Sequence, residues 1–299
     1  MLRAWFGNLS LPELARRIWR ETNEDKVFGR AAELAYYLLL ALFPMLIFLS
    51  SLIGFLPDAQ ERIFQAMARV VPGEAMKLVH ETIRDVVQNR SGSLLSFGVL
   101  GTLWAASGGV TAVMDTLNAA YDAEENRSFW KIRLIAVGLT MMLALLVVGG
   151  VVMIVFGDRL IEWLAPHLGL GTTVTRIWSW VDYVLGLAFL FLGLQLIYYF
   201  GPNLKQDWRW ITPGAIFAVL SLILTSVLLS LYLRYAPSYS ATYGSLGAVV
   251  VLMLWLYLMG AILLIGGEIN SEIRQAALPA PESRAATPPG KPVNSPSLG

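Results

Sequence analysis

The sequence contains no cysteine, which excludes disulfides and thiolate metal sites. Histidine is almost absent, since His80 and His167 are the only two and are too few for a His-rich metal site. Charge is scarce as well: Asp, Glu, Lys and Arg make up 14% of the chain, against about 25% in an average soluble domain. The formal net charge is +1, so the chain lacks the basic surface of a nucleic-acid binder. We therefore expect no cofactor, no metal and no nucleic-acid partner.

What the chain has in abundance is long apolar sequence, with 56% hydrophobic residues. The clearest stretch runs from Leu246 to Gly267 without one charged residue. At about 1.5 Å per residue, a helix of about 22 residues crosses a hydrocarbon core of about 30 Å. The sequence therefore predicts an integral membrane protein whose solvent is largely lipid.

Six such stretches predict an all-α fold with six transmembrane helices. Their expected bounds are 31–56, 94–119, 134–156, 181–200, 211–233 and 246–267, within a membrane domain that covers 1–275. Amphipathic helices are expected at the N-terminus, over 8–20, and as a pair within 58–93. The pair either lies on the bilayer surface or folds over the spans as a lid. The proline-rich stretch 276–299 predicts a disordered tail.

Basic residues predict how the chain is oriented in a bacterial inner membrane. The side that holds both termini collects 14 Lys and Arg residues, against 8 on the other side. Because positive charge accumulates on the cytoplasmic side, both termini are expected there. The segment 58–93 then lies outside the cytoplasm, where it is a candidate docking surface for an envelope protein.

The first span carries polar groups that lipid does not favour. Glu33, Tyr36 and Tyr37 follow helical spacing and share one face. A carboxylate about one turn into a span either snorkels to the interface or finds a partner, and both readings are open. Pro44 removes one backbone donor near the middle of the span, which predicts a kink.

The second span combines small and polar residues on one stripe. Ser107, Gly108 and Gly109 permit close helix approach. Asp115 and Asn118 are expected to face the same way as each other. The stripe is either a packed helix–helix seam with polar contacts or a polar path through the bundle.

Further polar or flexible residues mark the ends of later spans. Gln195, Glu268 and Asn270 are candidate path-lining or binding residues, as is Tyr243 before the last span. Pro213 and Gly244 are candidate hinges at the starts of the fifth and sixth spans.

Four blocks of the sequence, in one order, resemble the YihY/virulence factor BrkB family. They cover 31–56, 101–133, 207–218 and 243–272. The resemblance implies a six-span protein of the bacterial inner membrane, and some members are linked to envelope integrity. It carries over to Tyr36, Pro44, Trp104, Ser107, Asn118, Tyr121, Pro213, Gly214, Tyr243, Gly244, Glu268 and Asn270. Glu33 departs from the family pattern, which has a small or uncharged residue there.

Two functions are compatible with these residues. One is a transporter or conduit for lipids or other amphiphiles, in which the polar groups line a path. The other is a scaffold without transport, in which they hold helices together and 58–93 docks a partner; an oligomer is compatible with either. We do not expect an enzyme. Members of the family have been labelled ribonuclease BN, but both histidines stand alone and the sequence has no clustered His/Asp ligands for metal-dependent RNA hydrolysis.

Overall fold

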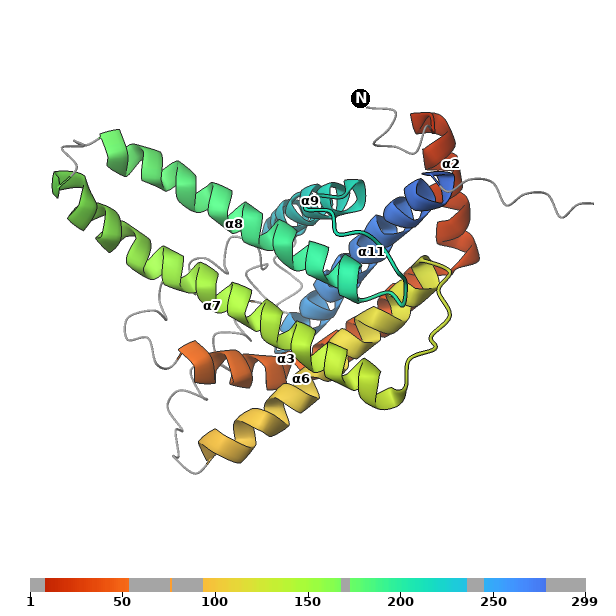
Figure 1. The fold of residues 1–299 in the computed structure, drawn as a ribbon, viewed down its shortest axis with the longest axis horizontal. Helices are drawn as coiled ribbons and strands as arrows, with labels where there is room; N and C mark the ends of the chain where they lie inside the picture. Colours follow the sequence, from red (N-terminus) through yellow and green to blue (C-terminus); the bar gives the residue numbers. More distant parts are fainter. Residues whose placement is uncertain (1–8, 54–75, 77–93, 168–172, 236–244, 278–299) are drawn as a thin grey trace, which may run out of the picture.

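The computed structural model describes residues 9–53, 76, 94–167, 173–235 and 245–277, and its regular elements there are all α-helices (Figure 1). They are α2 (Leu11–Glu24), α3 (Val27–Ile53), α6 (Leu94–Ala120), α7 (Phe129–His167), α8 (Thr173–Phe200), α9 (Pro213–Tyr235) and α11 (Ser245–Ala277). Tyr243, Gly244, the tail beyond Ala277 and all of 58–93 except Met76 lie outside the described residues.

The helices confirm the all-α class and the membrane character of the chain. Among the described residues, three stretches are long and apolar enough to cross a bilayer: Phe129–Gly150, Pro213–Tyr232 and Gly247–Ala277. A shorter apolar helix covers Val184–Phe200. The predicted number of six spans remains a prediction, although each predicted span falls on one of α3, α6, α7, α8, α9 and α11.

Several helices are longer than the predicted spans. α7 begins at Phe129 and continues to His167, and α8 begins at Thr173, so most of the expected loop 157–180 is helical. α11 likewise continues to Ala277, past the predicted start of the tail. The physical reason is that hydropathy marks only the part of a helix that suits lipid. The backbone hydrogen-bond ladder needs no apolar side chains and continues into the interfacial region.

α11 is the central helix of the fold. It packs against α2, α3, α6 and α9, while α7 and α8 form a neighbouring pair (Figure 1). This pair contacts the rest mainly through α6, and also through α3 and α9. The main core contains Leu34 of α3, Leu117 of α6, Tyr198 of α8 and Leu264 of α11, all almost fully buried. One apolar cluster thus holds four helices from distant parts of the chain.

Successive helices alternate in direction, so six helix ends meet at one end of the molecule. The end of α6 bonds to the segment after α8, where the Asn203 backbone N–H donates to Asn118 Oδ1 at 2.7 Å. The start of α9 bonds to the end of α11, where the Gly214 N–H donates to Asn270 Oδ1 at 2.8 Å. We call this region, built from 118–127, 198–214 and 268–275 together with α2 and Asp25, the polar end.

The N-terminal helix forms as expected, but it packs on protein. Its apolar residues Leu14 and Ile18 pack against Ile269 and Ile273 of α11. Ser10 occupies the N-cap position of α2 without a side-chain capping bond. Glu13 pairs with Arg17 at 2.9 Å, one helical turn away.

Candidate functional site

Gly109 sets how closely α3 and α6 approach each other. A Cβ at this position would lie 2.8 Å from the Ala41 Cβ, closer than real Cβ atoms pack. Gly108 has nothing within 4 Å of its hypothetical Cβ. Only one glycine of the pair is therefore needed for contact with α3. α3 itself runs on as a helix through Pro44.

One face of α3 is exposed along its first half. Glu33 is exposed, as are Tyr36 at 53% and Tyr37 at 43%, and Leu40 continues the row at 55%. On the other side of the same helix Leu34 is 1% exposed and belongs to the main core. Glu33, Tyr36 and Tyr37 therefore share one face of α3, as predicted, and this face is exposed.

α6 contributes a second exposed row on the same side of the helix pair. Asp115 and Trp104 are exposed, whereas Val113 and Leu117 pack into the main core beside α11. Because α11 packs on one side of both α3 and α6, the exposed rows of the two helices share the opposite side. We call Glu33, Tyr36, Tyr37, Leu40, Trp104 and Asp115 the α3–α6 face.

Glu33 and Asp115 lie at a similar height on the α3–α6 face. The two helices run in opposite directions (Figure 1) and cross near Gly109 and Ala41. Asp115 lies six residues after Gly109 on α6, and Glu33 lies eight residues before Ala41 on α3. At a rise of about 1.5 Å per residue, the two carboxylates are displaced from the crossing point by similar distances along their helices. Two carboxylates therefore stand near one level of an otherwise aromatic and apolar surface.

Asn118 does not share this face, so the expected common direction of Asp115 and Asn118 is wrong. Asp115 is exposed, whereas Asn118 is 4% exposed. Positions three apart on a helix differ by about 60° in direction, and the boundary of the core falls between these two. Ser107, also predicted as a site residue, is fully buried and donates to the Trp104 carbonyl at 2.7 Å.

Asn118 is instead a buried junction of the polar end. Its amide nitrogen donates to Glu125 Oε2 at 2.8 Å, and its oxygen accepts from the Asn203 backbone. Glu125 pairs with Arg127 at 2.6 Å, and Arg127 also donates to the Gly201 carbonyl at 3.1 Å. Hydrogen bonds from Arg127 lower the pKa of Glu125 to about 2, although partial burial opposes the shift. This junction ties the segment after α6 to the segment after α8.

Gln195 and Asn270 are engaged near the start of α9. Thr212 donates to Gln195 Oε1 at 3.2 Å, and the Gly214 backbone donates to Asn270. A Cβ on Gly214 would clash with the Gly266 carbonyl and lie 2.7 Å from Asn270 Cγ. α9 and α11 are thus in backbone contact here, and Pro213 is the first residue of α9.

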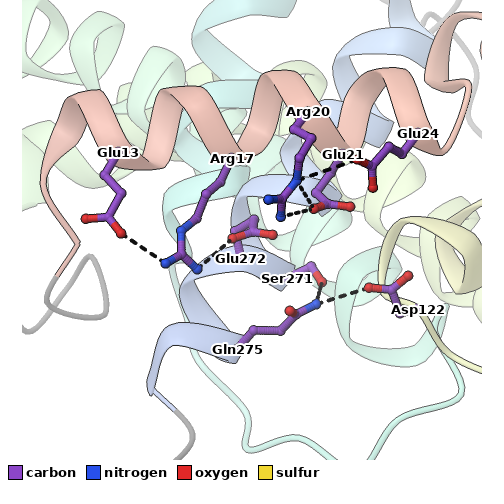
Figure 2. A network of polar contacts seen from close by, with 9 residues as sticks. All are labelled: Glu13, Arg17, Arg20, Glu21, Glu24, Asp122, Ser271, Glu272 and Gln275. Atoms are coloured by element: carbon purple, nitrogen blue, oxygen red, sulfur yellow. Dashed lines mark hydrogen bonds and ion pairs between the residues drawn. The ribbon is translucent and has the colours of Figure 1, made fainter. Parts of the chain in front are cut away.

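α2 contributes charged side chains to the same region (Figure 2). Arg17 lies between Glu13 and Glu272, at 2.9 Å and 3.6 Å from their carboxylates. Arg20 pairs with Glu21 at 2.7 Å. On the far side, Gln275 donates to Asp122 at 3.1 Å, which joins the end of α11 to the end of α6.

Glu268 is the most enclosed charged side chain of the polar end. It is 2% exposed, Glu272 one turn later is 3% exposed, and Asp25 in the turn between α2 and α3 interacts with the Glu268 carboxyl. The sequence predicted Glu268 as a site residue but gave no such prediction for Arg17, Asp25 and Glu272. The spacing of Glu268 and Glu272 places them on one helix face, and this signal could have identified Glu272. Nothing local in the sequence marks Asp25.

Known proteins resemble the chain over most of its length. The family described as Virulence factor BrkB matches residues 18–290. The putative ribonuclease-like protein YfkH of Bacillus subtilis is 38% identical over 243 residues, which is 81% of this chain and 88% of that protein. UPF0761 membrane proteins of Tolumonas auensis and Alteromonas mediterranea are each 25% identical, over 85% and 92% of this chain and 83% and 93% of their own lengths. No solved structure gives a significant match.

Proposed function

Because this chain belongs to the BrkB virulence-factor family of membrane proteins, we propose that it handles an amphiphile, with the α3–α6 face as the contact surface for a lipid headgroup. The supporting observation is that Glu33, Tyr36, Tyr37 and Asp115 are exposed on one side of two helices. Carboxylates that face lipid are costly unless a polar partner meets them. A headgroup that travels along the surface is such a partner.

The chemistry of the face favours a headgroup with a positively charged amine. Glu33 and Asp115 supply negative charge, and the exposed rings of Tyr36 and Tyr37 offer surfaces that attract cations. The Trp104 ring is already covered by the guanidinium of Arg133, 4.1 Å from its centroid. The lipid tail can stay in the bilayer while the headgroup moves along the protein. No enclosed channel is required, which agrees with the hydrogen bonds that the side-chain oxygens of Gln195 and Asn270 and the amide nitrogen of Asn118 make within the protein.

The proposal places the chain in a bacterial inner membrane with both termini in the cytoplasm. The supporting observation is that α2 and the end of α11 pack together, so they lie on one side of the membrane. The basic residues of that side, including Arg17, Arg127 and Arg274, favour the cytoplasm. The ribonuclease-like name belongs to the Bacillus relative, and a nuclease activity is not part of our proposal.

Transbilayer lipid movement in liposomes tests the proposal. Protein would be reconstituted with acyl-labelled phosphatidylethanolamine, and label on the inner leaflet would be followed by its protection from a membrane-impermeant quencher. We expect faster movement than in protein-free liposomes, at least a several-fold loss in Glu33→Gln and Asp115→Asn, and no change in the exposed control Glu24→Gln. Slower movement of phosphatidylglycerol, which lacks the amine, is also expected. Wild-type protein that moves no lipid would refute the proposal.

A membrane scaffold is the second candidate, and the mutual pairing of the buried polar groups favours it. Asn118 binds Glu125 and Asn203, and Asn270 binds Gly214, as in a seam that holds helices together. Site-specific crosslinking from residues 60–90 in cells would separate the two candidates. One stoichiometric envelope protein at these positions, together with inactive liposomes, would favour the scaffold.

A further inference from the structure

Three side-chain atoms in the last turns of α11 are buried without a hydrogen-bond partner: Glu268 Oε1, Asn270 Nδ2 and Glu272 Oε2. Glu272 has the nearby charge of Arg17 at 3.6 Å. Glu268 is 2% exposed, the least of any charged residue among the described parts of the chain. An ionised carboxylate in such surroundings destabilises the fold unless a cation or several donors compensate it.

The strongest charges that act on Glu268 are negative. They come from Asp25 in the turn between α2 and α3, from Asp122 just after α6, and from Glu21 on α2. The Asp25 carboxyl interacts directly with that of Glu268, and burial raises the pKa of Asp25 above its ordinary value. These surroundings therefore disfavour the state in which the Asp25 and Glu268 carboxyl groups are both ionised.

The remaining charged groups around the pair are already engaged. On α2, Arg17 and Arg20 pair with Glu272 and Glu21. On α3, Arg30 Nε donates to the Asp25 backbone carbonyl at 2.9 Å, which fixes the turn. On α11, Arg274 donates to the Lys205 carbonyl. Tyr121, after α6, is fully buried, and burial holds its pKa well above the ordinary value, so it stays neutral.

We propose that Asp25 and Glu268 form a binding site for one proton, which they share at neutral pH. The proton is covalently held by one carboxyl oxygen and is donated in a hydrogen bond to the other carboxylate. The pair then carries one negative charge and fastens the α2–α3 turn to α11. When the proton leaves to water, the buried Glu268 anion faces the half-buried Asp25 anion, and the turn separates from α11. This inference does not depend on lipid handling.

Infrared spectroscopy of the purified full-length protein in detergent tests the site. At pH 7 the wild type is expected to show the C=O stretch of a buried protonated carboxyl, with the small shift on transfer to D₂O that marks an exchangeable proton. Glu268→Gln removes this band, whereas Glu24→Gln, an exposed carboxylate on α2, keeps it. If the Glu268 variant does not fold, Asp25→Asn carries the test, because the band must then shift or vanish.

The pH dependence of stability provides a second readout. A carboxyl pair whose affinity for protons is higher in the folded state stabilises the fold fully below the ordinary carboxyl range and loses this contribution as pH rises. One extra bound proton changes the folding equilibrium up to about tenfold per pH unit. We expect this slope in the wild type and in Glu24→Gln, and its absence in Glu268→Gln. A wild type without the infrared band at pH 7, or an identical band in folded Glu268→Gln and Asp25→Asn, would overturn the proposal.

Discussion

Gly109 of α6 lies directly against Ala41 of α3, with room for a hydrogen atom and not for a methyl group: a Cβ at position 109 would stand 2.8 Å from the Ala41 Cβ. This contact sets the spacing of the two helices that present Glu33 and Asp115. The α3–α6 face therefore depends on one glycine that is itself buried.

Gly109→Ala tests this contact against its neighbour. The added methyl forces α3 and α6 apart, and overpacking of this kind costs about 1–3 kcal/mol. Gly108→Ala is the matched control, because that position has open space and alanine is about 1 kcal/mol better than glycine in a helix. Thermal unfolding in detergent should show a lower Tm for the first variant and an equal or higher Tm for the second. Equal effects of the two would contradict the close approach.

Asn118→Ala should destabilise the polar end. The change removes the donor to Glu125 and leaves the Asn203 backbone N–H without its acceptor, and a buried unsatisfied group costs about 1–3 kcal/mol. Asp115→Ala, one turn earlier and exposed, should change the free energy of unfolding by about 0.5 kcal/mol or less. Denaturant unfolding of both variants provides the comparison. A larger effect at Asp115 would show that the burial boundary on α6 is misplaced.

Glu125 should give the polar end an acid-sensitive contribution to stability. Hydrogen bonds from Arg127 lower its folded pKa to about 2 from the ordinary value of 4.5. The stabilisation is therefore present above about pH 4.5 and is lost as pH falls toward 2. Glu125→Gln should flatten this part of the Tm profile against pH, while Glu124→Gln, also an acid of the same loop, should leave it unchanged. A profile identical in all three proteins would rule out the ion pair as its source.

Gly214→Ala should be among the most damaging single-methyl changes in the chain. Its Cβ would meet the Gly266 carbonyl, which is backbone of the central helix, and the Asn270 side chain, which accepts the Gly214 N–H. We expect a loss of about 1–3 kcal/mol or more. Gly138→Ala on α7, where nothing lies within 4 Å, is the control. Limited proteolysis and Tm of the two variants would measure the difference, and tolerance of alanine at 214 would contradict the α9–α11 contact.

The sequence predicted the helices well because apolar composition over about 20 residues is a strong signal. It predicted helix ends poorly, as at His167 and Thr173, because backbone hydrogen bonding continues beyond the apolar stretch. Spacing correctly gathered Glu33, Tyr36 and Tyr37 on one face. Spacing misplaced Asn118 relative to Asp115. Helical periodicity gives the angle between two side chains around the helix axis, but it does not say which of them a neighbouring helix covers.

The pairing of Asp25 with Glu268 was beyond the reach of local patterns. The two residues lie in segments at opposite ends of the described chain, and the packing of α2 and α3 on α11 brings them together. The same is true of Arg17 and Glu272. Contacts between residues so far apart in the sequence depend on which helices pack together and in which direction each one runs. Composition alone does not specify either.

The contact between α2 and α11 has a consequence for how the protein is made. α2 leaves the ribosome before α11, but Leu14 finds Ile269 and Ile273 only when α11 has been synthesised and inserted. Until then the apolar face of α2 must be shielded from water by another surface, such as the membrane or a chaperone. Synthesis of α11, rather than insertion of the helices before it, is thus the step at which this end of the molecule closes.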